Sequence, residues 1–243
     1  MINPIETYNE YVLQKALENK EQRKLDNPKN RFSASSAGLC YRKHWYMQNE
    51  AETKPEDIDS LRLMRLGSVM GEDFYDGIEA IRDKHKDVEI YQETLLESEK
   101  LNIVGHLDLL IVKDRKGYLY DWKTANSFKF KNIFSGKNSN PSINYELQLG
   151  TYALIAVEMG LCDSIVHMGL VYYSKNDSKM EEKKVSRDMI EEADKYWKDV
   201  SLSCLGEPDF DEGKSPVYKW ECGKYCNYAL ICPSPINKDY ENK

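Results

Sequence analysis

The sequence has 243 residues, of which 41% are hydrophobic and 31% are charged, and its formal net charge is −7. This length suits one elaborated domain, and no stretch approaches the ~20 consecutive apolar residues that a membrane-spanning helix requires. The acidic balance excludes a generally basic surface, so a nucleic-acid partner would have to meet a local cluster of Lys and Arg.

The N-terminal half is predicted to be mainly helical. Apolar spacing predicts helices over 4–26, 39–46 and 58–84. Asn27-Pro28 ends the first helix. The first residues lack the basic and then apolar pattern of a signal peptide, so we expect a cytoplasmic protein whose cysteines are reduced.

The middle of the chain changes to a period of two, which is typical of strands. Strands are predicted over 89–93, 103–112 and 117–123, and the last two form an antiparallel hairpin through a short polar turn. A helix over 143–159, a strand over 164–173 and a helix over 187–204 follow. The order predicts one α/β domain with a mixed sheet flanked by helices, comprising an N-terminal helix (1–32), a core (33–175) and a C-terminal helix with a cysteine-containing segment (187–243).

Two carboxylates and a lysine are expected to meet on the predicted hairpin. Side chains two apart on a strand share a face, so Asp108, Asp121 and Lys123 project toward a common volume. Mg²⁺ or Mn²⁺ held by both carboxylates could activate water for phosphodiester hydrolysis, and the lysine could orient that water. An exposed salt bridge between Asp121 and Lys123, with Asp108 in a turn, explains the same residues equally well.

Three motifs in this order resemble those of the PD-(D/E)XK nuclease superfamily. Gly105-His-Leu-Asp108 and Asp121-Trp-Lys123 are similar to its second and third motifs, and Gln148 with Tyr152 resembles the Q-x-x-x-Y motif of its RecB-like branch. The resemblance implies a restriction-endonuclease-like core in which Gln148 and Tyr152 lie near the active site and the substrate strand. Being four apart on a helix, they share one face.

The first motif of this branch supplies a metal ligand from a helix, often histidine. In the matching stretch, 66–72, this sequence has Gly71 or Glu72 where that histidine would fall. A glutamate oxygen suits Mg²⁺ better than imidazole does, so Glu72 is predicted as a third ligand beside Asp108 and Asp121. A solvated helix glutamate is the alternative.

Four cysteines also resemble a pattern found in this branch. Cys222, Cys226 and Cys232 are clustered near the C-terminus and Cys40 is distant. The pattern is similar to that of RecB-like nucleases with a [4Fe-4S] cluster, such as the AddB nuclease domain and CRISPR-adaptation nucleases, in which such a cluster joins the two ends of the domain. The resemblance favours the cluster, and structural Zn²⁺ held by the same four cysteines is the alternative. Cys162 and Cys204 are expected to be small buried hydrophobes.

The segment 124–142 is rich in cations and rings. It contains Lys129, Lys131 and Lys137 and no acidic residue, and Phe130 lies between them. Cations and rings suit single-stranded nucleic acid, so we predict a mobile binding loop, with Arg42 as a further contact. Phenylalanines tucked into the core are the alternative.

The resemblance as a whole implies an Mg²⁺- or Mn²⁺-dependent deoxyribonuclease. An exonuclease acting on DNA ends or single strands in replication, recombination or repair is expected over an endonuclease, and a phage-encoded member would act in the host cytoplasm. A non-catalytic DNA-binding or scaffold protein of the same fold, and a CRISPR-adaptation-type nuclease acting within a complex, are the alternatives. The protein could form a homo-oligomer or bind a recombination or replication protein. No membrane partner is expected.

Overall fold

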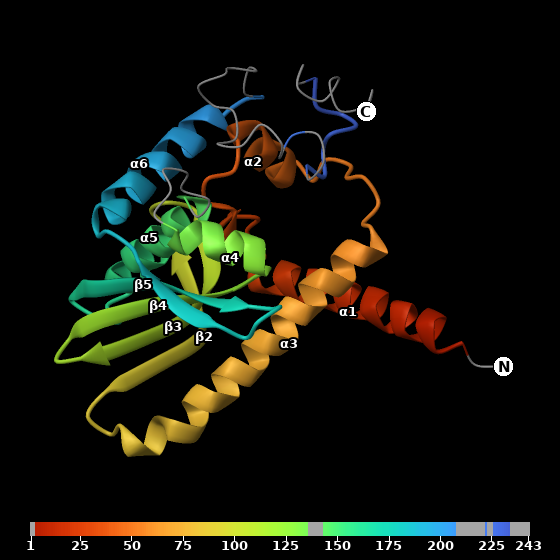
Figure 1. Cartoon of the computed structure of the whole chain (residues 1–243). Helices are drawn as coiled ribbons and strands as arrows, with labels where there is room; N and C mark the ends of the chain where they lie inside the picture. Colours follow the sequence, from red (N-terminus) through yellow and green to blue (C-terminus); the bar gives the residue numbers. More distant parts are fainter. Residues whose placement is uncertain (1–2, 136–142, 208–221, 223–225, 234–243) are drawn as a thin grey trace.

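The computed structural model describes residues 3–135, 143–207, 222 and 226–233 (Figure 1). The helices are α1 (Pro4–Asp26), α2 (Tyr41–Gln48), α3 (Ile58–Ile81), α4 (Ser127–Phe134), α5 (Ile143–Glu158) and α6 (Asp188–Ser203). The strands are β1 (Phe32–Ser33), β2 (Glu89–Ser98), β3 (Ile103–Lys113), β4 (Lys116–Ala125), β5 (Ser164–Ser174) and β6 (Met180–Lys184). Short 3₁₀ turns lie at Ala34–Ser36 and Arg82–Lys84. No helix among these residues is both long and apolar enough to cross a bilayer.

The sheet is mixed, as predicted. Its order is β1-β3-β4-β5-β6, and β2 pairs with β3 as well. The pairs β2–β3, β3–β4 and β5–β6 are antiparallel, whereas β1–β3 and β4–β5 are parallel. The parallel β4–β5 pair requires a crossover, and α5 supplies it.

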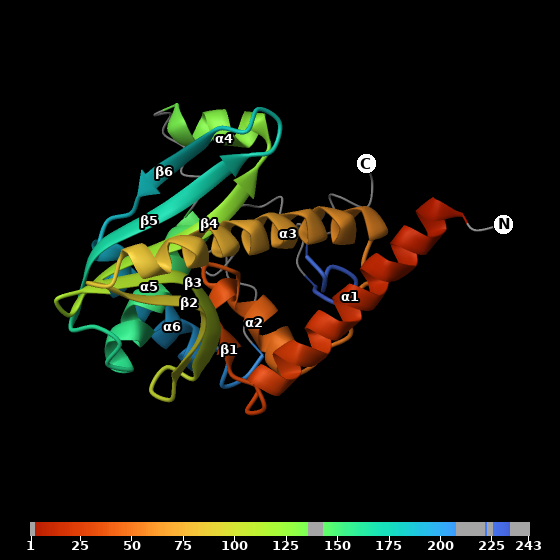
Figure 2. The same cartoon turned by 90° about the horizontal axis from the view of Figure 1, so that it is seen from below.

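Helices cover both faces of the sheet. Figure 2 shows α3 along one face, with α5 and α6 on the other. On the first face, Phe74 of α3 stacks on Trp122 of β4 with ring centroids 4.2 Å apart. On the second face, α5 is largely buried, and α6 approaches it closely because Gly150 has no side chain: a Cβ there would lie 2.2 Å from the Met189 carbonyl oxygen.

Two elements differ from the sequence-based prediction. The segment predicted as a mobile loop begins with α4, because the Asn126 side chain accepts a hydrogen bond from the Lys129 N–H at 2.8 Å and caps the helix. The strand β6 was not predicted, because its residues, Met-Glu-Glu-Lys-Lys, are charged and it lies at a sheet edge.

Candidate active site

The acidic residues lie where β3 and β4 separate. The antiparallel ladder runs from the turn to the pair Leu109–Tyr120 and ends there. The next residues would be Asp108 and Asp121, which face each other across the opening. There the Trp122 N–H donates to Asp108 Oδ2 at 2.7 Å instead of to a strand carbonyl. The separation of the strands therefore leaves room for two carboxylates on one face.

Asp121 is fully buried and poorly satisfied. Its Oδ2 forms an ion pair with Lys123 Nζ at 2.5 Å. Beyond that ion pair, neither carboxylate oxygen has a well-aligned hydrogen bond among the described residues. A buried carboxylate normally has several such bonds, so Asp121 has unused capacity for a positively charged ligand.

The electrostatics of the site also favour a cation. Burial, and then the neighbouring Asp108, raise the pKa of Asp121 to about 7. Burial raises the pKa of Asp108 too, against the opposing influence of Lys123 and the Trp122 N–H. Burial lowers the pKa of Lys123, but the two carboxylates outweigh it and raise that pKa. Two carboxylates facing one ammonium leave an excess of negative charge that a divalent ion would neutralise.

Among the described residues, no group of three or more His, Cys, Asp and Glu side chains has metal-binding geometry. Mg²⁺ commonly binds through only one or two carboxylates and completes its octahedron with water and substrate phosphate. Asp108 and Asp121 satisfy this smaller requirement, and the unsatisfied oxygens of Asp121 fit it well.

Gln148 and Tyr152 lie beside the acidic pair, on α5. The Gln148 amide donates to the Tyr152 hydroxyl at 3.0 Å, and both side chains are buried. Burial, followed by Asp108 and Asp121, raises the pKa of Tyr152 well above its usual value. The hydroxyl therefore stays protonated next to the carboxylates.

Glu72 lies away from this group. It is exposed, and its carboxylate pairs with Arg65 on the same helix at 3.1 Å. Gly71 instead faces the sheet, where a Cβ would lie 3.7 Å from Tyr75 Cε2. One turn later, Tyr75 lies beside Glu93 and Asp108; desolvation raises the pKa of both carboxyl groups, and the single Tyr75 O–H, which can donate to one of them at a time, acts against that rise.

Sequence reasoning missed three residues at the site. Tyr75 and Glu93 form one pair; Glu93 has a φ of 45° and lies opposite Asp108, where the β2–β3 ladder skips one residue on each strand without a change of register. The sequence-based prediction ended the strand at residue 93, whereas β2 continues to Ser98.

The third missed residue is Tyr145, at the start of α5. Lys123 Nζ and Lys129 Nζ each lie 4.9 Å from the centre of its ring. This cation–π pair joins the active-site lysine to α4. Nothing in the local sequence indicated it, because the three residues are separated along the chain.

The residues predicted to contact nucleic acid fall into different environments. Phe130 is buried and packs on Phe134 at 4.9 Å, so its ring belongs to the core and the prediction that it stacks on bases is wrong. Lys131 is exposed, and Lys137 lies outside the described residues. Arg42 is mostly buried, and its guanidinium pairs with Glu207 at 2.7 Å.

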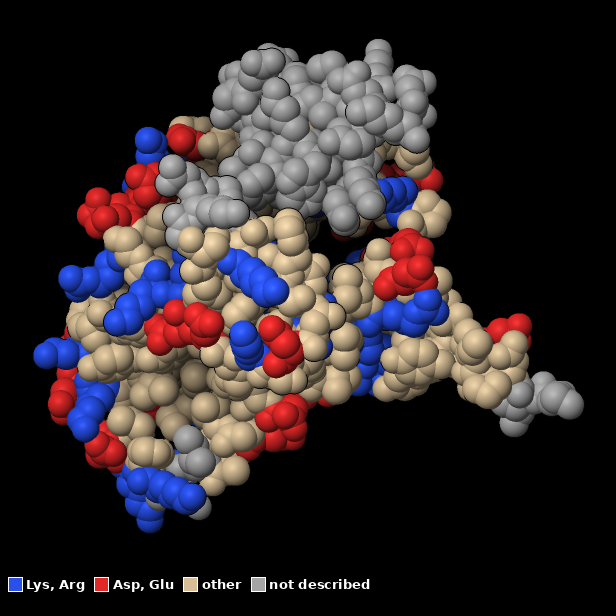
Figure 3. Space-filling model, viewed as in Figure 1, with Lys and Arg blue, Asp and Glu red and all other residues tan. Residues whose placement is uncertain are grey.

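Charge on the face drawn in Figure 3 is mixed. Lys and Arg alternate with Asp and Glu over the described part of that face. A strand bound there would gain affinity from local contacts near the acidic pair more than from a broad basic surface.

The N-terminal cysteine is electrostatically coupled to the C-terminal ones. Burial raises the pKa of Cys40 to about 12, and Cys226, Cys222 and Cys232 contribute in the same direction. The C-terminal segment packs on α2 independently of the thiols: Tyr228 stacks on Tyr46 at 5.2 Å. The structure thus brings α2 and the segment 226–233 together, although metal-binding geometry is absent among the described residues.

Comparison with known proteins supports this architecture. A family model described as the PD-(D/E)XK nuclease superfamily matches residues 12–233. No curated protein matches the sequence. The crystal structure of SSO0001 is 21% identical, with a TM-score of 0.56 over 93% of this chain and 96% of that one, which shows a shared fold. An alkaline exonuclease, LHK-Exo from Laribacter hongkongensis, is 12% identical, with a TM-score of 0.46 over 72% of this chain and 88% of its own.

Proposed function

This chain belongs to the PD-(D/E)XK nuclease superfamily, and from that membership we propose that it is a divalent-metal-dependent deoxyribonuclease. The observation that carries the proposal is the buried Asp121 carboxylate, which faces Asp108 and, apart from its ion pair with Lys123, has no hydrogen-bond partner among the described residues. A purely structural salt bridge would be fully satisfied or exposed to water.

In this proposal Asp108 and Asp121 hold Mg²⁺ or Mn²⁺. When bound, such an ion polarises a phosphoryl oxygen and lowers the pKa of a water ligand. Lys123, held in place by Asp121, orients the attacking water and offsets negative charge that develops on the phosphate. The Trp122 N–H fixes Asp108, so the two carboxylates keep their separation when a substrate arrives.

The neighbouring residues would act on the substrate strand. Gln148 and Tyr152 form the wall of the site on α5, and the protonated Tyr152 hydroxyl can donate only one hydrogen bond. We assign these two residues to binding the strand next to the scissile bond. An exonuclease in replication, recombination or repair fits this arrangement, with Lys129 and the exposed Lys131 as the nearest candidates for contacts with phosphates.

The test uses end-labelled single- and double-stranded DNA with Mg²⁺ or Mn²⁺. Asp121→Asn and Lys123→Ala should each lower the cleavage rate at least ~100-fold, whereas Asp163→Asn, at an exposed ion pair with Arg115, should not. Labels at the 5′ and 3′ ends separate exonuclease from endonuclease products. Cleavage that survives both substitutions, or no cleavage under any of these conditions, would overturn the proposal.

We also propose a structural metal at Cys40, Cys222, Cys226 and Cys232. The mutual influence of these thiols on the pKa of Cys40 supports it, and either a [4Fe-4S] cluster or Zn²⁺ would suit four thiolates. The visible spectrum of anaerobically purified protein, with a cluster band near roughly 400 nm, and its zinc content distinguish the two. Cys232→Ser should lose the metal and Cys204→Ser should retain it; protein with neither iron nor zinc would contradict the assignment.

A further inference from the structure

The edge of β3 has an opening next to Asp108. β2 pairs with one edge of β3 along almost its whole length. On the other edge, β1 pairs with residues 103–104 and β4 pairs with residues 109–113. Residues 105–108 therefore have no strand partner on that edge among the described residues, and their backbone groups face a space between β1 and β4.

A cavity of about 480 Å³ adjoins this stretch of β3, because Val104, Gly105, His106 and Asp108 line it. We call it the β1–β3 pocket; its other walls come from the segment between Arg23 and Ser36, from α2 and from Gln148 and Tyr152 of α5, and none of its lining residues belongs to β4. Its volume falls within the ~300–1,000 Å³ of small-molecule sites, so it suits one nucleotide unit and not a length of duplex. Asp108 is part of its wall, so the pocket adjoins the proposed metal centre.

The pocket combines neutral and charged groups: Arg23, Arg31, Asp26 and Asp108 also lie in its wall. Three serine side chains, two asparagines, Gln148 and Tyr152 supply hydrogen-bonding groups, and Phe32, Met47 and Val104 supply apolar surface. Asp26 pairs with His106 across the rim at 3.7 Å. Amide and hydroxyl groups beside apolar surface match a nucleoside, whereas a bare phosphate would require unpaired cations.

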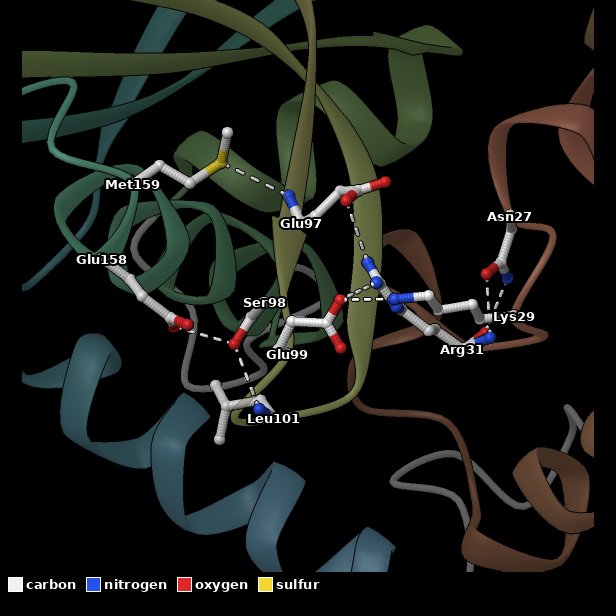
Figure 4. A network of polar contacts seen from close by, with 9 residues as sticks. All are labelled: Asn27, Lys29, Arg31, Glu97, Ser98, Glu99, Leu101, Glu158 and Met159. Carbon is white, nitrogen blue, oxygen red and sulfur yellow. Dashed lines mark hydrogen bonds and ion pairs between the residues drawn. The ribbon is translucent and has the colours of Figure 1, made fainter.

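Of the two arginines in the wall, Arg31 is already neutralised, as Figure 4 shows for the network around it. The buried Arg31 guanidinium pairs with Glu97 at 3.2 Å and with Glu99. Asn27 makes reciprocal 2.8 Å hydrogen bonds with the Arg31 backbone, which fixes this wall. Arg31 Nε is buried and has no hydrogen-bond partner among the described residues.

We propose that the β1–β3 pocket binds the nucleoside adjoining the scissile phosphodiester, at the end of a single DNA strand. This inference rests on the proposed function and adds the substrate to it. With a terminal nucleoside in the pocket, its phosphodiester lies at Asp108, and hydrolysis releases one nucleotide at a time. A duplex does not enter unless its end is unpaired, because the pocket admits a single unit.

Binding can be measured without metal, so this test is independent of catalysis. Thymidine and thymidine 5′-monophosphate should both bind the wild-type protein in calorimetry or NMR titrations, and inorganic phosphate should not. Ser35→Trp, which fills the pocket from an exposed position, should weaken binding at least tenfold; Met47→Trp provides a second filling variant. Ser164→Trp, at the far end of β5, is the control, and circular dichroism verifies folding.

Two results would overturn the inference: inorganic phosphate binding as tightly as the nucleotide, or unchanged nucleotide binding in both filling variants. In the cleavage assay, the filling variants should release mononucleotides at least tenfold more slowly than Ser164→Trp. If DNA is cleaved but mononucleotide release survives both filling variants, the pocket assignment fails while the nuclease assignment stands. If metal-dependent cleavage is absent but nucleosides bind, the nuclease assignment fails instead.

Discussion

His44 makes the stability of this fold sensitive to acid. The side chain is 1% exposed, and its Nε2 lies 2.6 Å from the Tyr196 hydroxyl, which itself donates to the Leu39 carbonyl at 2.7 Å. Burial, and to a lesser extent the charge of Lys43, lower the pKa of His44 from 6.5 to about 3. The folded protein therefore keeps this imidazole neutral under conditions in which the unfolded chain would protonate it.

The sign and size of the effect follow from these two pKa values. Because the unfolded state binds the additional proton, the free energy of unfolding decreases as the pH falls below 6.5 and levels off near the folded pKa of about 3. Relative to pH 7.5, this group alone should cost about 1.4 kcal/mol at pH 5.5 and about 2.7 kcal/mol at pH 4.5. That is a large fraction of a typical domain stability.

Urea unfolding of the wild type and of His44→Gln at pH 7.5, 5.5 and 4.5 tests this reasoning. Other groups titrate equally in the wild type and in His44→Gln. The quantity to compare is therefore the difference in unfolding free energy between the two proteins, measured at each pH. The destabilisation caused by His44→Gln should shrink by about 2.7 kcal/mol between pH 7.5 and 4.5. His85→Gln, at an exposed position, should show no such change. Parallel pH profiles for the wild type and His44→Gln would refute the assignment of a buried neutral imidazole.

Three further predictions concern the active site and its scaffold. The pKa of Asp121 is about 7 in the cation-free protein, so Mg²⁺ or Mn²⁺ must displace a proton from Asp121 below that pH. Calorimetry should therefore show the affinity for the metal ion falling as the pH drops through 7. An affinity that stays constant from pH 8 to 6 would contradict the assignment of Asp121 as a metal ligand. Tyr145→Leu removes the ring that contacts Lys123 and should lower the cleavage rate roughly tenfold, whereas Tyr145→Phe should keep the wild-type rate because the cation–π contact needs only the ring. Equal cleavage rates in the two variants would contradict this role of Tyr145. Gly150→Ala should destabilise the fold by about 3 kcal/mol or more in urea unfolding, because the added Cβ would meet the Met189 carbonyl oxygen. If the variant is as stable as the wild type, α6 can move away from α5.

The fold could be predicted largely from local patterns. The hairpin that carries Asp108 and Asp121 follows from a period of two and a short polar turn, and the structure confirms it. The α4 helix could have been predicted from Asn126, a good N-cap, but the cations and rings of that segment suggested a binding loop. Phe130 illustrates the consequence, since helical spacing turns its ring into the core.

The parts that could not be predicted depend on contacts between distant segments. Glu93 reaches the site because the register of β2 on β3 puts it opposite Asp108, and Tyr75 does so because α3 packs across the sheet next to β4. Neither feature leaves a trace in residue spacing. The family motif directed attention to Glu72, whereas the helix phase turns that side chain toward Arg65 and solvent.

The four-residue opening in β3 also bears on how the protein avoids aggregation. An unpaired strand edge normally invites another chain to add a strand, which is a common route to association. Here the unpaired stretch, 105–108, is closed at both ends by β1 and β4 and is shorter than a typical strand of ~5–6 residues. A neighbouring polypeptide cannot lie along it without displacing one of those strands, so the backbone groups remain accessible to a small ligand but not to a second sheet.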